Sequence, residues 1–327
     1  MAAKGADLLM VLFRIYRYDP AREAEARYDE HEIEPKLGQT VLDVLRDLRF
    51  GPDPTLAFRH SCRAAICGSC GMRINKRARL ACNTQVKQLI DLYGYVLIEP
   101  LGNLPVVRDL VVDQDPFWKD VHAVQPYLQP AAAPEGTYEI PKSRMDELRM
   151  VQDCIMCGCC LSDCTSREAN PHFLGPAALA KAYRMADDPR DRATVERLTL
   201  YSKPNGIWDC DTCLFCDEVC PKGVRPMEAI MKLREMAIEN GITHTQGAKH
   251  ALAFFKTVEK TGKLNEALTA VGSLGVGGML KSGPLILKVG YRGKNPHVRK
   301  PPIRGIKDVQ SLMASVRESK RKRKAAK

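Results

Sequence analysis

The chain has 327 residues, of which 45% are hydrophobic, and it carries 13 cysteines and a formal net charge of +11. This length allows two or three domains with cores of their own. No apolar run reaches the roughly 20 residues that span a bilayer, and residues 1–7 have no signal-peptide pattern, so we expect neither a membrane-spanning segment nor a disulfide-stabilised secreted fold. Clustered cysteines in a reducing compartment indicate metal binding.

Residues 1–115 have the pattern of a small β-rich domain. Four runs favour strands, the second as hairpin partner of the first, and they lie at residues 8–18, 28–33, 71–74 and 96–99. Thr40, with Asp43 three residues later, is typical of an N-cap, and the apolar residues that follow recur at helical spacing. We therefore expect a mostly antiparallel sheet crossed by one helix.

The middle of the chain has a helical pattern. Residues 116–141 are rich in Pro and Ala without a clear period, and we interpret them as a linker. In the domain that follows, residues 142–241, Pro176 is a good first residue for a helix. The apolar positions of residues 227–238 form an amphipathic face, with Gly241 as the C-cap.

Residues 242–327 form a C-terminal extension of different composition. Residues 248–268 have a helical pattern, whereas residues 272–302 are rich in Gly and Pro and are predicted to wrap a partner or to stay mobile. The basic tail, residues 317–327, holds seven basic side chains and one acidic one. Such a run is typical of a solvated, disordered end, with anionic lipid or an acidic partner as alternative contacts. Nucleic-acid binding is not expected, because no aromatic residue is interleaved with the charges.

Twelve of the thirteen cysteines fall into spacings that bind iron–sulfur clusters. The plant-ferredoxin spacing, C-x4-C-x2-C-x11-C, is formed by Cys62, Cys67, Cys70 and Cys82. Its short gaps allow one loop to surround two irons, and Gly68 and Gly71 let the backbone approach the inorganic sulfides. This pattern predicts a [2Fe–2S] cluster ligated by the four thiolates.

The spacing C-x2-C-x2-C-x3-C occurs twice and is typical of two-cluster bacterial ferredoxins, in which the fourth cysteine of each run ligates the other cluster. One [4Fe–4S] cluster is therefore predicted on Cys154, Cys157, Cys160 and Cys220. A second [4Fe–4S] cluster is predicted on Cys164, Cys210, Cys213 and Cys216, with [3Fe–4S] as the alternative without Cys213. Cys159 is left over and is expected to be a small buried residue.

Zinc is the competing metal, because C-x2-C pairs also build four-cysteine zinc sites. Zinc pairs are usually a dozen or more residues apart, so the tripled spacing favours iron–sulfur. No nucleotide-binding or Ser/His/Asp pattern is recognisable, and no catalytic residue is predicted. The predicted fold class is α+β: a plant-ferredoxin-like (β-grasp) domain, an α-helical bacterial-ferredoxin-like domain and the C-terminal extension.

Several stretches closely resemble the iron–sulfur subunit of succinate dehydrogenase and fumarate reductase. They are FRHSCRAAICGSCGMRINKRARLAC at 58–82, LPVVRDLVVDQDPFWKDVHAVQPYL at 104–128, CIMCGCCLSDC at 154–164 and NPHFLGPAALAKAYRMADDPRD at 170–191. The resemblance covers residues 8–240. It implies an FAD-containing flavoprotein partner that oxidises succinate, a membrane-anchor subunit, and electron transfer from flavin through three clusters toward quinone. It also implies a peripheral location at the cytoplasmic face of the cell membrane.

Four positions near the third cluster depart from the family pattern. Cys213 stands where most relatives have an apolar residue and a [3Fe–4S] cluster. Where relatives line a quinone pocket with Pro, Ser and Trp, this chain has Thr165, Ser166 and Ala169, and Asp211 replaces a family His. These departures resemble the subgroup whose anchor is a cysteine-rich, heterodisulfide-reductase-like protein, and they argue that quinone is reached only indirectly.

Three functional hypotheses follow. The first is the electron-transfer subunit of a succinate dehydrogenase complex. The second is the same subunit in a fumarate reductase fed by quinol or thiols, because cluster potentials depend on their surroundings and the sequence does not set the direction. The third, from a different class, is a zinc-stabilised protein with a nucleic-acid-binding tail.

Overall fold

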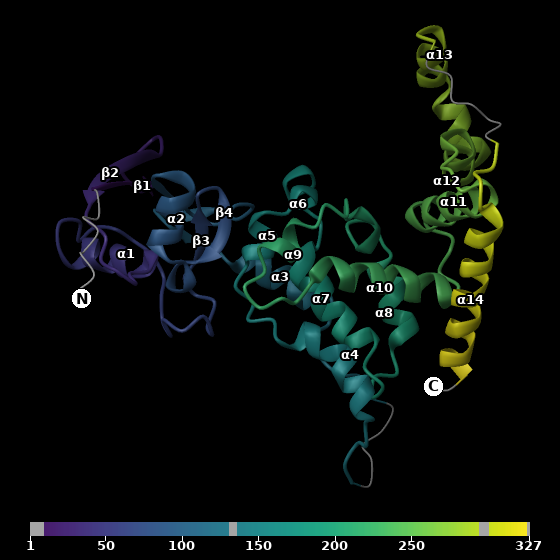
Figure 1. The fold of residues 1–327 in the computed structure, drawn as a ribbon, viewed down its shortest axis with the longest axis horizontal. Helices are drawn as coiled ribbons and strands as arrows, with labels where there is room; N and C mark the ends of the chain where they lie inside the picture. Colours follow the sequence, from purple (N-terminus) through teal and green to yellow (C-terminus); the bar gives the residue numbers. More distant parts are fainter. Residues whose placement is uncertain (1–9, 131–135, 294–300, 326–327) are drawn as a thin grey trace, which may run out of the picture. The chain divides into compact units, whose positions relative to one another are not determined.

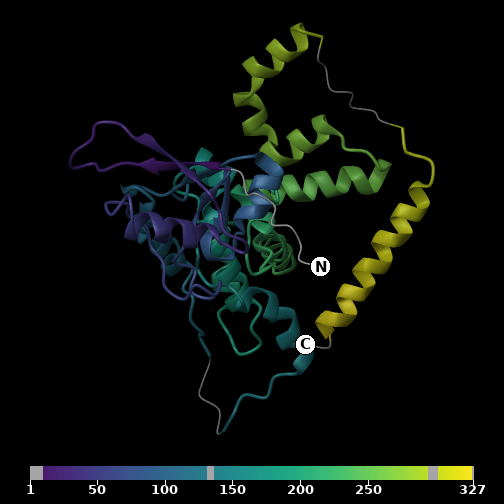
Figure 2. The ribbon, with the colours of Figure 1, turned by 60° about the vertical axis from the view of Figure 1, so that its left-hand side comes forward.

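The computed structural model describes residues 10–130, 136–293 and 301–325 (Figure 1, Figure 2). Its contacts divide the chain into two compact units, Met1–Met236 and Ala237–Lys327. The division falls inside one long helix, α10, Pro226–Glu239. It lies a few residues before the boundary that the sequence predicts after residue 241.

A five-stranded sheet forms the first domain, in the order β2-β1-β5-β3-β4. Its strands are β1 Val11–Arg17, β2 Arg27–Ile33, β3 Gly71–Ile74, β4 Arg77–Leu80 and β5 Val96–Glu99. β1 pairs antiparallel with β2 and parallel with β5, and β3 pairs antiparallel with both β4 and β5. The predicted, mostly antiparallel sheet is confirmed, and β4 is an addition that the sequence pattern did not indicate.

Helix α1, Val41–Phe50, covers this sheet with an apolar face that includes Leu42 and Leu45. The predicted N-cap is present: Thr40 Oγ1 accepts from the Asp43 N–H at 3.2 Å, and the Asp43 carboxylate accepts from the Thr40 N–H at 3.0 Å. The remaining short elements of the domain are η1 Ala81–Asn83, α2 Val86–Tyr93, β6 Val106–Arg108 and β7 Val111–Val112. The cysteine loop, residues 62–70, therefore precedes a strand of a well-packed sheet.

The rest of the first unit is helical. Besides α10, its elements are α3 Asp115–Ala123, α4 Lys142–Gln152, α5 Cys159–Ser162, α6 Thr165–Ala169, α7 Gly175–Ala186, α8 Thr194–Tyr201, η2 Ile207–Asp209 and α9 Phe215–Glu218. The predicted linker, residues 116–141, thus begins with a helix. Pro116 fits the first turn of α3, and Phe117 and Val121, one turn apart, are both buried.

The second unit consists of α11 Gln246–Thr261, α12 Glu266–Lys281, α13 Gly283–Tyr291 and α14 Ile306–Ala325. Residues 272–302, which the sequence predicted to wrap a partner or to stay mobile, are mostly helical in their described part up to residue 293, while residues 294–300 lie outside the described residues. The Gly and Pro residues interrupt this part only locally: Gly275 kinks α12, and Pro284 stands in the first turn of α13, where its missing N–H costs nothing.

The basic tail is also more ordered than its composition suggests. The described part, up to residue 325, belongs to α14 rather than to a disordered end. Arg317 explains part of this order, because its guanidinium lies 2.7 Å from the Glu259 carboxylate and stacks 5.4 Å from the ring centre of Phe255. Among the described residues, no helix is both long and apolar enough to cross a membrane.

Candidate metal centres

The plant-type cysteine loop turns its backbone N–H groups toward its own sulfurs. The Cys62 sulfur accepts at 3.2–3.4 Å from the N–H groups of Ala64, Ile66 and Cys67. The Ala65 N–H points at the Cys82 sulfur, 3.3 Å away. Left-handed backbone at Arg63, Ala65 and Gly68 makes this inward turn possible. Such donors stabilise negative charge on thiolates and on a bound cluster.

Cys70 and Cys82 complete this first set. The Ala81 N–H donates to the Cys70 carbonyl at 3.0 Å, which places η1 and Cys82 next to the end of the loop. A hydrogen bond from the Ser69 side chain lowers the pKa of Cys67 to about 6, whereas burial raises the pKa of Cys70 to about 12. The structure thus brings together the four cysteines that the sequence grouped.

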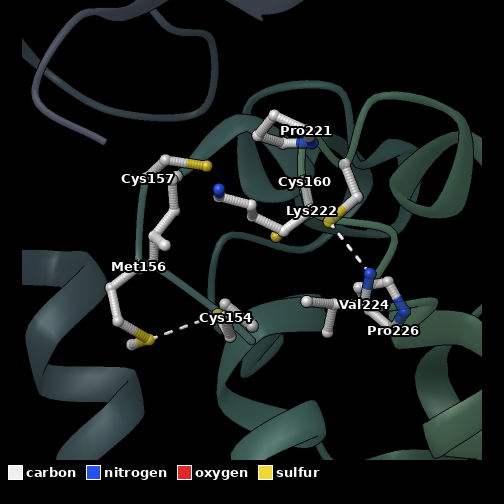
Figure 3. A pocket seen from close by; sticks show the side chains of 12 residues that line it. Cys154, Met156, Cys157, Cys160, Pro221, Lys222, Val224 and Pro226 are labelled. Atoms are coloured by element: carbon white, nitrogen blue, oxygen red, sulfur yellow. Dashed lines mark hydrogen bonds between the residues drawn. The ribbon is translucent and has the colours of Figure 1, made fainter. Parts of the chain in front are cut away.

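The second set of cysteines lines one cavity, shown in Figure 3, and its members are Cys154, Cys157, Cys160 and Cys220. The first two precede α5, Cys160 lies inside it, and Cys220 follows α9. The Val224 N–H donates to the Cys220 sulfur at 3.3 Å. Lys222 also lines the cavity; burial raises the pKa of Cys154, and the positive charge of Lys181 opposes part of that increase. Cys220 therefore crosses over to the first run, as its spacing predicted.

The third set gathers around the second run, and its members are Cys164, Cys210, Cys213 and Cys216. Burial, with a smaller contribution from nearby Cys210 and Cys213, raises the pKa of Cys164 to about 11. Burial also raises the pKa of Cys216, and nearby Asp217 and the same two cysteines add to this increase. α10 supports this run, because Arg234 donates to the carbonyl of Cys210 at 2.7 Å.

The two cysteine runs have the same backbone. In the first, Met156 and Gly158 have φ of 55° and 79°; in the second, Thr212 and Leu214, at the equivalent positions, have φ of 58° and 71°. A four-residue helix follows five residues after the first cysteine of each run, as α5 and as α9. Cys213 therefore occupies the place in the second run that Cys157 occupies in the first.

The surroundings of these two equivalent cysteines differ. Cys157 is half-buried, and a hydrogen bond from the Cys159 side chain lowers its pKa to about 7. Cys213 is exposed, and its sulfur accepts from the Thr165 hydroxyl at 3.4 Å. Cys159 itself is fully buried, as expected for the one cysteine without a predicted ligand role.

Two glycines bring the plant-type loop against the second set of cysteines. A Cβ atom on Gly68 would lie 2.9 Å from the Cβ of Cys157, and one on Gly71 would lie 2.9 Å from the Cys157 carbonyl oxygen. Real Cβ atoms do not approach that closely, so only glycine permits the contact at both positions. The first and second cysteine sets therefore touch through backbone.

Asn103 and Asp163 hold this contact from the side, and sequence reasoning missed both. The Asn103 side-chain amide donates to three carbonyls at the end of α5, those of Leu161, Ser162 and Cys164, at 2.8–3.2 Å. The Asp163 carboxylate accepts from the Ala78 N–H of β4 at 2.9 Å. The Gly102–Asn103 pair signals a turn in the sequence, but nothing local indicates its partner.

The arrangement of thiols fits iron–sulfur clusters better than single zinc ions. Tetrahedral Zn–S bonds of about 2.3 Å would draw four sulfurs to within about 3.8 Å of one another. The second set of thiols lines one cavity, and N–H groups are directed at sulfurs of the first and second sets, an arrangement that suits polynuclear clusters.

The residues at the predicted quinone position interact with one another. Ser166 is buried; its hydroxyl accepts from the Asp211 N–H and donates to the Asp211 carboxylate, both at 3.0 Å. Ala169, at the end of α6, is exposed and provides no aromatic wall. The Ser166 hydroxyl therefore both donates and accepts within the chain.

Comparison with known protein families yields two matches. A 2Fe-2S iron-sulfur cluster binding domain matches residues 12–119, and a 4Fe-4S dicluster domain matches residues 150–224. Together they contain all twelve cysteines of the three sets. The solved structure titled the Mycobacterium smegmatis Sdh1 complex in the apo form contains a chain that aligns with a TM-score of 0.65 and 26% identity, over 72% of this chain and 98% of that one.

Curated relatives match most of their own length. The fumarate reductase iron-sulfur subunit of Haemophilus influenzae is 38% identical over 66% of this chain and 88% of its own. The succinate dehydrogenase iron-sulfur subunit of Paracoccus denitrificans is 39% identical over 69% and 88%. The 8-methylmenaquinol:fumarate reductase iron-sulfur subunit of Wolinella succinogenes is 34% identical over 87% and 91%. Since the first unit is about 72% of the chain, the last match extends into the second unit.

Proposed function

The chain belongs to the family of iron–sulfur subunits of succinate dehydrogenases and fumarate reductases, and on that premise we propose that it connects a succinate-oxidising, FAD-containing flavoprotein with a membrane-anchor subunit. As a member of this family it is an electron-transfer subunit that holds [2Fe–2S] and [4Fe–4S] clusters. Such clusters, when bound, take up and release single electrons. The zinc-stabilised nucleic-acid-binding hypothesis is thereby set aside.

The proposed ligands are the three sets of cysteines described above. Cys62, Cys67, Cys70 and Cys82 hold the [2Fe–2S] cluster; Cys154, Cys157, Cys160 and Cys220 hold the first [4Fe–4S] cluster; and Cys164, Cys210, Cys213 and Cys216 hold the second. One observation carries this proposal. The three sets are contiguous. Gly68 and Gly71 contact Cys157, Cys220 of the second run lies with the cysteines of the first, and Cys164 of the first run lies with those of the second.

The protein's own contribution is to position and tune these sites. The N–H groups directed at Cys62, Cys82 and Cys220 stabilise negative charge on sulfur. Burial raises the pKa values of Cys160 and Cys216, and metal coordination would remove their thiol protons outright. The glycine contact keeps the first two sites close, which electron transfer between them requires.

We further propose that electrons leave through the second [4Fe–4S] site for a redox group on the anchor, of the cysteine-rich type, so that quinone is reached only indirectly. The mutual hydrogen bonds of Ser166 and Asp211, and the missing wall at Ala169, support this route. The corresponding location is peripheral, at the cytoplasmic face of the cell membrane.

Succinate oxidation is the proposed direction, and fumarate reduction is the second candidate. The second candidate is favoured by the Wolinella relative, a menaquinol:fumarate reductase subunit whose similarity extends into the second unit. Assays of the purified complex with succinate plus a quinone acceptor, and with fumarate plus a reduced donor, separate the two. The proposed direction requires the succinate rate to exceed the fumarate rate; a faster fumarate reaction contradicts it.

The ligand proposal is tested by comparing two cysteine variants of the complex. Cys67→Ala should abolish the EPR signal of the reduced [2Fe–2S] cluster and stop succinate-dependent reduction of the later clusters. Cys159→Ser is the matched control: it replaces the thiol outside the three sets by a hydroxyl that can still donate to Cys157, and it should leave all three signals in place. An unchanged [2Fe–2S] signal in Cys67→Ala contradicts the assignment.

A further inference from the structure

The second unit turns apolar side chains outward. α12 faces α11 with polar residues: Thr269 and Ser273 are buried, and the Ser273 hydroxyl lies 3.0 Å from Nδ1 of His250 on α11. The apolar residues of the same helix are exposed instead, namely Leu268, Val271, Leu274 and Leu280. A helix on the surface of a protein in water has the opposite pattern, with its apolar stripe toward the core.

Small residues let α11 and α12 approach closely. A Cβ atom on Gly272 would lie 2.6 Å from the Cβ of Ala253, so the two helices meet backbone to backbone at this point. Small residues and hydroxyl groups between helices, with apolar side chains outside, are the packing that helices use in contact with lipid. The pair therefore has an exterior suited to an apolar medium.

α13 continues this exterior. Figure 1 and Figure 2 show it extending beyond the α11–α12 pair. Its described side chains include none that is buried, and Leu285, Leu287 and Tyr291 are 63%, 75% and 94% exposed. Together with the exposed apolar residues of α12, they form what we call the α12–α13 surface. Its members are Leu268, Val271, Leu274, Leu280, Leu285, Leu287 and Tyr291.

The described residues of this surface that follow Glu266 carry only positive charge. Residues 267–293 contain three basic side chains, Lys281, Lys288 and Arg292, and no Asp or Glu. On the neighbouring helix α11, Lys249, Lys256 and Lys260 line a shallow cavity of about 340 Å³, which Leu268 and Gly272 of α12 complete. Apolar side chains flanked by basic ones are the complement of an anionic lipid surface, where each basic residue contributes about 1 kcal/mol.

We propose that the α12–α13 surface docks on the anionic membrane interface, so that this subunit has a lipid contact of its own beside its anchor subunit. The helices lie in the interface rather than cross it. Gly275 breaks α12 with φ 63° and ψ −177°, and a new helix starts at Gly283. Neither of the two parts of α12, nor α13, approaches the roughly 20 residues needed to span the hydrocarbon core. The proposal adds to the proposed function but does not depend on electron transfer.

Sedimentation with lipid vesicles tests this proposal directly. The full-length, cluster-loaded chain is mixed with vesicles of phosphatidylcholine alone, or of phosphatidylcholine and phosphatidylglycerol in equal parts. Binding is expected only to the anionic vesicles, and it should weaken strongly at ~1 M salt, where the Debye length falls to about 3 Å. Equal binding to both vesicle types, or none to either, overturns the proposal.

Two variants and one matched control locate the contact. Leu287→Glu should weaken vesicle binding at least about tenfold. It removes a leucine that would be buried in the lipid on binding, and it adds a negative charge that the anionic lipid repels. Lys281→Gln with Lys288→Gln should weaken it about fivefold for each charge. Leu92→Glu on α2 changes a similarly exposed helical leucine, 69% against 75%, and should leave binding intact. Equal losses in Leu92→Glu and Leu287→Glu overturn the assignment.

A protein partner is the other possible occupant, and the same variants distinguish it. If Leu287→Glu prevents co-purification of the anchor subunit while the wild-type chain does not bind anionic vesicles, the surface is a protein interface and the lipid proposal is wrong. The electron-transfer proposal is judged separately, because cluster EPR signals do not enter this test.

Discussion

The two proposed [4Fe–4S] sites have the same backbone but different surroundings. Both runs have left-handed residues at the same two positions, and both contain a four-residue helix before their fourth cysteine. The first site is enclosed by the plant-type loop, since Gly68 and Gly71 contact Cys157. At the second, the equivalent Cys213 is exposed and is touched by the Thr165 hydroxyl. The two sites therefore share a backbone that places a cysteine at each equivalent position, and they differ in how far that cysteine is enclosed.

The largest expected effect comes from the enclosed site. Cys160 is fully buried in α5, so Cys160→Ala should remove its cluster together with the contacts packed around it. Loss of a metal site is among the changes that cost about 4 kcal/mol or more, so we expect little folded subunit. Soluble yield and iron content measure this. A folded variant with full iron would show that Cys160 is not a ligand.

Cys213→Val at the exposed site should behave differently. The protein should fold, because Cys213 contributes no buried packing, and should lose about one iron per chain, because one corner of the cluster then lacks a thiolate. Iron analysis and EPR of the oxidised protein should reveal a three-iron signal. If this variant fails to fold as Cys160→Ala does, the contrast between the two sites is mistaken.

Gly71→Ala tests the enclosure itself. The added methyl would lie 2.9 Å from the Cys157 carbonyl oxygen, and overpacking of this kind costs about 1–3 kcal/mol. Denaturant unfolding should show the loss, and the [2Fe–2S] and first [4Fe–4S] signals should weaken together. Gly277→Ala, where a methyl meets nothing within 4 Å, is the control and should not destabilise the clusters. Wild-type stability in Gly71→Ala would argue against a tight contact.

Ser166→Ala should have the smallest effect on the clusters and on electron transfer to quinone. It removes the two hydrogen bonds with Asp211, a loss of about 1–3 kcal/mol in a buried position. Because we place quinone on the anchor, the KM of the complex for quinone should remain unchanged within about twofold, which is less than 0.5 kcal/mol. A tenfold rise in KM without loss of stability would instead place quinone against this subunit.

The sequence predicted the cysteine-bearing domains well because their signals are local. β3 and β5 begin and end where the residue pattern placed them, and the cap at Thr40 is present. The cysteine sets also follow from spacing, since a run of C-x2-C-x2-C has few ways to surround a cluster. The structure adds the repeated backbone, in which Cys213 matches Cys157.

The sequence pattern did not indicate contacts between residues that lie far apart along the chain. Nothing near Asn103 indicates that it satisfies the carbonyls of α5, some sixty residues away. The helices of the second unit beyond residue 268 were not predicted, for another reason. Its Gly and Pro residues are typical of irregular chain, yet Gly272 serves helix packing and Pro284 starts a helix. Helix propensity alone does not show whether a Gly or Pro interrupts a helix or allows two helices to pack closely.

The central claim, that Cys213 makes the third cluster [4Fe–4S], is tested most directly by EPR of the wild-type complex, purified anaerobically and then oxidised. A fourth thiolate keeps the cubane complete, and an oxidised [4Fe–4S] cluster of this type is EPR-silent. The account predicts no three-iron signal in wild type and its appearance in Cys213→Val. A strong three-iron signal in the anaerobically purified wild-type complex would contradict it.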